Sequence, residues 1–196
     1  MMKHLLYLFL LLTPTLLLVS CKTDYQNIPT YTGTRQLQAV IEVPAGNNHQ
    51  LKYDLKKQEF VNAKDAGKDK LVEFLPFPGN YGFIPSTELG QNDRGLNILV
   101  LSERVETGSV LEVLPVGVLQ LETAGNLEPV IVAVPARPSD RTISATTMSE
   151  LTKKYPAAKE IIRLWFTHEN PALNTKFVAW RDEQFADQEI QRWMKL

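Results

Sequence analysis

Few residues of this chain have the types and spacing that a standard catalytic site requires. No Gly-x-Ser-x-Gly turn presents a serine nucleophile, and the single cysteine, Cys21, directly follows an apolar N-terminal run. His49 and His168 each lack a second histidine or a cysteine at zinc-ligand spacing, so we expect surface or helix-capping roles for both. Neither the dinucleotide nor the Walker form of a phosphate-binding glycine loop occurs. Serine, cysteine, zinc and nucleotide-loop chemistries are therefore not indicated.

The most informative segment is the polar turn at residues 92–97. It has the sequence Asn-Asp-Arg-Gly-Leu-Asn and leads directly into the apolar run at residues 98–101. Asp93 is the only carboxylate of the turn, beside two amides and one guanidinium. A lone carboxylate among amides favours a turn residue, with a displaced metal ligand as the alternative.

Short apolar runs bounded by turn residues lie ahead of this segment and behind it. They are rich in Val, Ile and Leu, and Gly, Pro or Asn separates them. The runs predict strands at residues 37–43, 51–55, 97–102, 109–121 and 130–134.

Helical periodicity replaces these runs in the C-terminal third. Residues 147–150, Thr-Met-Ser-Glu, have the pattern of a capping box, and apolar residues recur at helical spacing from Leu151 to Phe166. A second amphipathic helix is predicted near the C-terminus, with Phe185, Ile190 and Trp193 on one face. Strands first and helices later predict an α+β domain, most simply a small barrel with helices packed outside it.

The N-terminus has the layout of a secretory signal at residues 1–20. A basic start at Lys3 and His4 is followed by an apolar run, which residues 13–15 (Thr-Pro-Thr) interrupt. That break makes a spanning helix of about 20 apolar residues the weaker interpretation. Residues 18–21, Leu-Val-Ser-Cys, resemble the bacterial lipobox, in which the cysteine is lipid-modified. An ordinary cleaved signal with an incidental cysteine is the alternative.

For the remaining chain, the sequence predicts a lipidated Cys21 with a polar tether at residues 21–36, followed by one domain at residues 37–196. The 176 residues left after removal of the signal are enough for a single hydrophobic core. With one cysteine, no intrachain disulfide forms. The net charge is −1, and −2 without Lys3, so no overall positive field attracts nucleic acid.

A succession of local motifs gives the chain its resemblance to a known family. The motifs occur in the order Val40 to Gly46, Leu51 to Asp54, Pro78 to Pro85, Ile98 to Leu101, Gly108 to Leu119 and Val132 to Pro135. The segments Asn-Tyr-Gly-x-Ile-Pro and Pro-Val-Gly-Val-Leu are the most specific of them. The succession resembles the family I soluble inorganic pyrophosphatases and covers nearly all of residues 37–196.

The resemblance implies a fold, a reaction and a ligand. The fold is a five-stranded, OB-like closed barrel with flanking helices. The reaction is the Mg²⁺-dependent hydrolysis of diphosphate to two phosphates, which needs clustered carboxylates for the metal ions and Lys, Arg and Tyr donors for the phosphate oxygens. A homo-oligomer, as in bacterial relatives, is a further implication.

Several residues match the pattern of that family. The resemblance implies metal binding by Glu42, Asp54, Glu122 and Glu128, with an apparent one-residue insertion between the last two. It implies phosphate binding by Lys52 and Tyr81. The alternative is that Glu42, Lys52 and Asp54 have no binding role and are strand residues on a solvated face of the barrel.

Other positions depart from the pattern. Asn92, Arg94 and Asn97 stand on the three positions of metal-binding aspartates, so the catalytic set is degenerate and Arg94 becomes a candidate phosphate ligand. A further set of departures lies elsewhere: Phe77 replaces a tyrosine, Val130 lies on or beside a lysine position, Glu169-Asn170 replaces a Tyr-Lys pair, and Lys70 stands one residue from the position of an arginine. Loss of one catalytic carboxylate or donor lowers a rate by about 10² to 10⁴. These departures predict weak or absent hydrolysis.

Two functional hypotheses follow for a protein of the bacterial cell envelope, lipid-anchored with its domain outside the cytoplasm. The first is an inorganic diphosphatase with a remodelled site that uses Mg²⁺. The second is a non-catalytic anion-binding or scaffold module that needs no cofactor, in which Arg94 and Lys52 hold a small phosphate-bearing anion directly.

Overall fold

The computed structural model describes residues 22–88 and 95–195 of the chain. Its strands are β1 (Leu37–Val43), β2 (Leu51–Asp54), β3 (Glu59–Asn62), β4 (Lys64–Asp65), β5 (Lys68–Asp69), β6 (Asn80–Ile84), β7 (Leu96–Val100), β8 (Val110–Thr123), β9 (Asn126–Pro135) and β10 (Lys176–Arg181). Its helices are α2 (Met148–Lys154), α3 (Pro156–His168) and α4 (Glu183–Trp193), with short 3-10 turns η1 (Tyr25–Asn27), η2 (Pro138–Asp140) and η3 (Pro171–Leu173). The fold is therefore mixed α+β, as predicted.

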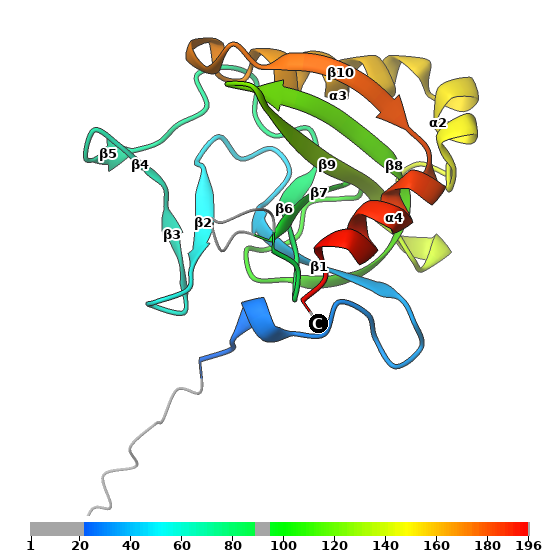
Figure 1. The fold of residues 1–196 in the computed structure, drawn as a ribbon, viewed down its shortest axis with the longest axis horizontal. Helices are drawn as coiled ribbons and strands as arrows, with labels where there is room; N and C mark the ends of the chain where they lie inside the picture. The colour runs from blue at the N-terminus through cyan, green and yellow to red at the C-terminus, as the bar shows by residue number, and fades with distance from the viewer. Residues whose placement is uncertain (1–21, 89–94, 196) are drawn as a thin grey trace, which may run out of the picture.

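One large sheet joins six of the strands in the order β1-β6-β7-β9-β8-β10. All its neighbours are antiparallel except β7 and β9, which are parallel. In addition, β1 pairs with β8, so the pairings run in a ring through β1, β6, β7, β9 and β8. Two small hairpins, β2–β3 and β4–β5, project to one side of the sheet, opposite the helices (Figure 1).

The central strands are buried on both faces because nearly every residue in them is apolar. Every residue of β7 is buried, and the side chains of neighbouring residues point to opposite faces. Leu99 belongs to a core cluster that includes Trp165 and Phe166 of α3, whereas Ile98 belongs to a second cluster with Ala186 and Ile190 of α4. The two faces of the sheet are thus covered by different helices.

The helices begin at recognisable caps. The hydroxyl of Thr147 accepts the backbone N–H of Glu150 at 3.1 Å, as the capping-box pattern predicts, although the Glu150 carboxylate accepts the N–H of Thr146 rather than that of Thr147. The predicted single helical stretch is divided at Tyr155 because Pro156 begins α3. Ile161, expected on the apolar face, is 56 % exposed.

The strand predictions agree with the structure to within a few residues, and five further strands were not predicted. The bounds of β1 are those expected, and β8 and β9 extend beyond their predicted runs. The unpredicted strands are β3, β4 and β5 of the small hairpins, β6, which contains the Asn80-Tyr81-Gly82 motif, and β10 at the sheet edge. All five are short, and the apolar part of β10 is only the four residues between Lys176 and Arg181, so none stands out as a long apolar run.

The segment from Lys22 to Gln36 packs against the domain, in contrast to the extended tether that its polar composition predicts. The Tyr25 ring contacts Tyr53 and Phe60 with centroid distances of 5.4 and 5.0 Å. Gln26 is buried and its side-chain amide donates to Thr87 O at 3.1 Å. One aromatic ring and one buried amide thus hold this segment, and neither gives the repeated apolar spacing by which strands and helices are identified in the sequence. No helix among the described residues is long and apolar enough to cross a bilayer.

Candidate functional site

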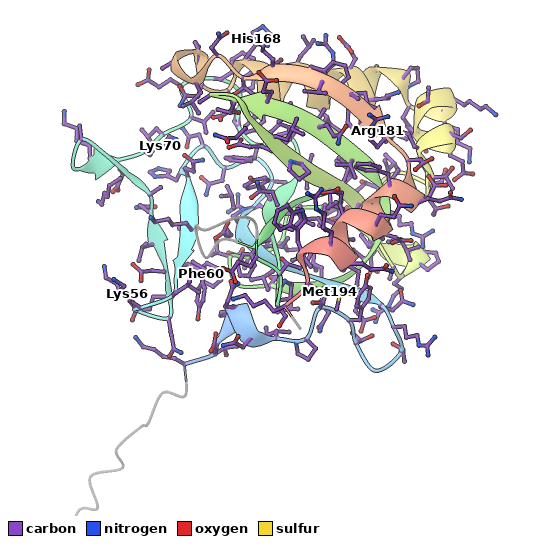
Figure 2. The ribbon with its side chains drawn as sticks, in the orientation of Figure 1. Lys56, Phe60, Lys70, His168, Arg181 and Met194 are labelled. Atoms are coloured by element: carbon purple, nitrogen blue, oxygen red, sulfur yellow. The ribbon has the colours of Figure 1, made fainter. Side chains whose placement is uncertain are left out.

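The larger of two adjoining clefts lies between the β2–β3 hairpin and strands β1 and β6. Its volume is about 580 Å³. Residues of both hairpins and both strands line it, and the charged ones are Glu42, Lys52, Asp54, Lys56, Lys64 and Lys70. Figure 2 shows Lys56 near the turn of the β2–β3 hairpin and Lys70 near its opposite end. Lysines are thus distributed along the cleft, where they exceed the carboxylates by four to two among the described residues.

Glu42 is buried, and its carboxylate has a structural partner. Only 7 % of the residue is exposed, and its Oε1 accepts the backbone N–H of Tyr53 at 2.7 Å. This bond joins strand β1, near its C-terminal end, to the β2–β3 hairpin that also lines the cleft. A buried carboxylate without donors would be costly, so this bond explains how Glu42 is tolerated there.

Asp54 ends β2 and closes the turn of the hairpin. Its Oδ1 accepts the backbone N–H groups of Lys56 and Lys57, each at 3.0 Å. The N–H of Lys57 is the main reason why the pKa of Asp54 lies below its usual value. The carboxylate is therefore ionised at neutral pH and orients the turn on which Lys56 lies.

Tyr81 lies where the two clefts meet. It lines both, is 8 % exposed, and its ring packs 5.3 Å from that of Phe77. Its neighbour Gly82 permits β6 to approach β1 closely, because a Cβ there would lie 1.9 Å from Val40 O. The Asn-Tyr-Gly motif thus includes one residue at the site and one that sets the strand spacing.

Asn80, the first residue of the same motif, connects two loops beside the clefts. It is fully buried and makes four hydrogen bonds. Its Oδ1 accepts the N–H groups of Ala45 and Val105 at 3.0 and 3.1 Å, and its Nδ2 donates to Ser102 Oγ and Glu103 O at 2.9 and 2.7 Å. A buried amide with all four bonds made is a structural residue rather than a ligand-binding one.

The smaller cleft has a volume of about 150 Å³ and shares Gln50, Lys70 and Tyr81 with the larger. Four aromatic rings form part of its wall, and Glu128, Glu169, Asn97 and Thr175 supply its other polar groups. The full lining is Gln50, Lys70, Phe77, Tyr81, Asn97, Leu121, Glu128, Val130, Trp165, Phe166, Glu169, Leu173 and Thr175.

The two carboxylates of the smaller cleft influence each other. Glu128 Oε2 accepts the hydroxyl of Thr123 at 3.1 Å. Burial raises the pKa of Glu169 above its usual value, the nearby Glu128 raises it further, and the ammonium of Lys70 lowers it. Sequence patterns did not predict that Lys70 and Glu169 line the same cleft, because the two residues are far apart in the chain.

The structure separates the predicted metal ligands into different environments. Glu42 and Asp54 line the larger cleft, Glu128 lines the smaller one, and Glu122 lies opposite Lys176 in the β8–β10 pairing and lines neither. Asn97 is 7 % exposed and reaches the smaller cleft from β7. The predicted phosphate ligand Lys52 lines the larger cleft. Asn92, Arg94 and Cys21 lie outside the described residues.

The described carboxylates are not clustered as a magnesium site with several ions requires. Within residues 22–88 and 95–195, no three Asp, Glu, His or Cys side chains gather closely enough to hold one metal ion. In addition, the carboxylates of Glu42 and Asp54 already accept backbone N–H groups. The described residues therefore do not fit a site for several Mg²⁺ ions, which bind through clustered carboxylates.

The remaining departures from the family pattern lie in or beside the smaller cleft. Phe77 is 4 % exposed and its ring is 4.5 Å from that of Trp165, and Val130 is 2 % exposed. Asn170 accepts the N–H of Ala172 at 3.2 Å and caps η3. His168, as expected, has an end-of-helix role, with its Nδ1 2.9 Å from Leu164 O. None of these groups supplies a cationic donor to the smaller cleft.

Comparison with known proteins gives consistent matches over most of the chain. The profile of the family described as inorganic pyrophosphatase matches residues 39–196. The inorganic pyrophosphatase of Aquifex pyrophilus is 32 % identical over 161 residues, which are 80 % of this chain and 86 % of that protein. The enzyme of Neisseria meningitidis serogroup B is 30 % identical over 166 residues, covering 81 % and 89 % of the two chains.

Solved structures give the same result for the fold. The crystal structure of inorganic pyrophosphatase from Thermus thermophilus superposes with a TM-score of 0.75 and 25 % identity, covering 88 % of this chain and 97 % of that one. A truncated Trypanosoma cruzi vacuolar soluble pyrophosphatase, solved in complex with PPi, has a TM-score of 0.72 at 15 % identity, covering 85 % and 71 %. The second of these similarities concerns the fold alone.

Proposed function

Because the chain belongs to the inorganic pyrophosphatase family, we propose that its larger cleft binds diphosphate or a related small phosphate-bearing anion. The family match extends over residues 39–196 and therefore includes every described residue that lines this cleft except Gln26. The observation that carries the proposal is the excess of lysines there, with Lys52, Lys56, Lys64 and Lys70 against Glu42 and Asp54. An anion with several charged oxygens is the ligand that such a cleft attracts.

The lysines would hold the ligand as separate point charges. A lysine ammonium has three donors on a flexible stem, so it adapts to phosphate oxygens without the fixed fork of an arginine. Lys52 on β2 and Lys70 after β5 approach the cleft from two different hairpins. Tyr81 lies at the border of the two clefts, where its ring limits the space available to the ligand.

We further propose that hydrolysis by the family reaction is weak or lost. The family reaction depends on Mg²⁺, which would supply the polarising charge and the activated water. Here Asn97 stands on one aspartate position, and Asn92 and Arg94 on the other two. Glu42 and Asp54 are already used in backbone hydrogen bonds. The donor set therefore favours a small anion held by lysines without a metal cluster.

The proposal includes the location and the form of the domain. We infer that residues 1–20 are a signal, that Cys21 carries a lipid, and that the domain lies outside the cytoplasm at a bacterial membrane. In support of a short connection, Lys22 Nζ bonds Glu59 Oε1 at 2.6 Å and Lys57 O at 3.0 Å, so the domain begins directly after the candidate anchor. We also infer that the ring of five paired strands is the closed, OB-like barrel expected for this family.

The test is phosphate release from diphosphate together with diphosphate binding. The full chain would be purified in detergent and assayed with Mg²⁺ or Mn²⁺ from mildly acidic to mildly alkaline pH. Binding would be measured by calorimetry with a metal chelator present. We expect binding that Lys52→Ala weakens about tenfold, the loss of roughly one charge-assisted contact, and no turnover above that variant. Metal-dependent turnover that Lys52→Ala abolishes would establish a working diphosphatase instead. Absence of binding would overturn the proposed function.

A further inference from the structure

The two clefts carry opposite charge although they adjoin. Among the residues that the structure describes, the lysines of the larger cleft outnumber its carboxylates by two. In the smaller cleft Glu128 and Glu169 outnumber Lys70 by one. Gln50, Lys70 and Tyr81 line both, so a single ligand could extend from one to the other. A positive cleft joined to a negative one is complementary to a ligand that has both an anionic and a cationic group.

The walls of the smaller cleft favour an organic cation. Four aromatic residues line it, and each ring contacts two of the others. The ring centroids are 5.3 Å apart for Phe77 and Tyr81, 6.0 Å for Tyr81 and Phe166, 4.9 Å for Phe166 and Trp165, and 4.5 Å for Trp165 and Phe77. Aromatic faces attract ammonium groups, and more strongly when water is excluded. The volume of about 150 Å³ suits a small alkylammonium group.

Gln50, which lines both clefts, has an acceptor without a donor. Its Oε1 is buried and has no hydrogen-bond partner among the described residues. A buried acceptor left without a donor costs about 1–3 kcal/mol. An ammonium N–H at the junction of the clefts would satisfy it, whereas a phosphate oxygen would not, because both atoms are acceptors.

The departures from the family pattern point in the same direction. The resemblance places a lysine at or beside Val130 and a Tyr-Lys pair at Glu169-Asn170, all of them groups that would hold phosphate. In this chain Val130 is apolar and Glu169 is a carboxylate, and both line the smaller cleft. The lysines of the larger cleft remain. The changes thus remove anion binding from one half of the site and leave it in the other.

We propose that the two clefts together bind a phosphate ester that carries an ammonium group. The phosphate lies among the lysines of the larger cleft, and the ammonium lies in the smaller cleft against Glu169, Glu128 and the aromatic wall. Lys70 lines both clefts and so lies at the junction between the two groups. The inference rests on the proposed phosphate binding in the larger cleft and adds the second group of the ligand.

The experiment compares two ligands that differ only in the ammonium group. Calorimetry would measure 2-aminoethyl phosphate and ethyl phosphate binding to the full chain in detergent, with a metal chelator present. We expect 2-aminoethyl phosphate to bind at least about tenfold more tightly, as one charge-assisted contact provides. Glu169→Gln should reduce this preference to within about twofold and leave the affinity for ethyl phosphate equal or higher, because a negative charge is removed.

The controls separate this inference from the proposed function. Glu112→Gln, an exposed change on β8 that lines neither cleft, should keep the full preference. Equal affinity for the two ligands would overturn the inference and leave phosphate binding established. A further outcome is that Mg²⁺ abolishes the preference for 2-aminoethyl phosphate, and does so only when Glu169 is present. That result would assign the smaller cleft to a metal ion and would also overturn the inference. Binding of neither ligand would overturn both proposals.

Discussion

The carboxylate of Glu42 accepts the backbone N–H of Tyr53 at 2.7 Å, and this bond fixes the β2–β3 hairpin to strand β1. Both residues line the larger cleft. A residue that the family resemblance marks as a metal ligand therefore has a second role, because it holds in place the hairpin on which Lys52 lies. A binding role and a structural role for Glu42 can be separated by measuring stability and affinity on the same variants.

Glu42→Ala should destabilise the fold by about 1–3 kcal/mol, because it leaves the N–H of Tyr53 buried without an acceptor. Glu42→Gln should cost less, since the amide oxygen of glutamine can accept the same N–H. Urea unfolding would measure both variants, with the exposed Glu112→Ala as a control that changes stability by less than about 0.5 kcal/mol. Equal stability of Glu42→Ala and the wild type would show that the bond does not contribute to the stability of the fold.

The N-terminal segment yields a prediction about the attachment of the domain. Tyr25→Ala removes the ring that packs on Tyr53 and Phe60, so we expect a loss of about 1–3 kcal/mol in unfolding free energy, below the cost for a fully buried ring. Proteolysis between residues 22 and 36 should also become faster. The exposed Thr34→Ala is the matched control from the same segment. If both variants behave alike, the segment is an extended tether, as its composition predicts.

Much of the fold could be predicted from the sequence, because apolar runs and turn residues mark the central strands directly. The bounds of β1 and the α+β order follow from such local signals. The packing of Tyr25 and the meeting of Lys70 with Glu169 could not be predicted in this way. Both depend on contacts between residues far apart in the chain, which hydrophobic periodicity does not reveal. Motif comparison identified Glu169 as a departure but not its role, because that role depends on its neighbours in space.

The cap of α2 yields a prediction about pH. The pKa of Glu150 lies at about 2, below its usual 4.5, chiefly because its carboxylate accepts the backbone N–H of Thr146 and also bonds Lys154. A lowered pKa in the folded state adds stability that is present above pH 4.5 and is lost as the pH falls toward 2. The stability difference between the wild type and Glu150→Gln should therefore be constant near neutral pH and shrink across that interval. Urea midpoints at several pH values measure it, and parallel curves would contradict the assignment.

Glu169 should show the opposite pH dependence. Its pKa is raised, first by burial, so the folded protein holds a proton that the unfolded chain releases above the usual value of 4.5. Stability is then lost as the pH rises through the folded-state pKa. Glu169→Gln should be as stable as the wild type in acid and more stable near neutral pH. The unfolding free energies of the two proteins would be compared with those of Glu112→Gln, and a constant difference at all pH values would argue against a raised pKa.

Restoring the lost aspartates tests how far the site has diverged. The triple variant Asn92→Asp, Arg94→Asp, Asn97→Asp returns three carboxylates to the positions of the family ligands. We expect it to remain without Mg²⁺-dependent diphosphate hydrolysis, because Val130 and Glu169 still stand where the family pattern has phosphate donors and Glu169 repels the second phosphate. Phosphate release with Mg²⁺ measures this, with Lys52→Ala in the triple background as the control. A large gain in the triple variant alone would mean that only the metal site has decayed, and the carboxylate in the smaller cleft would then have no bearing on the choice of ligand.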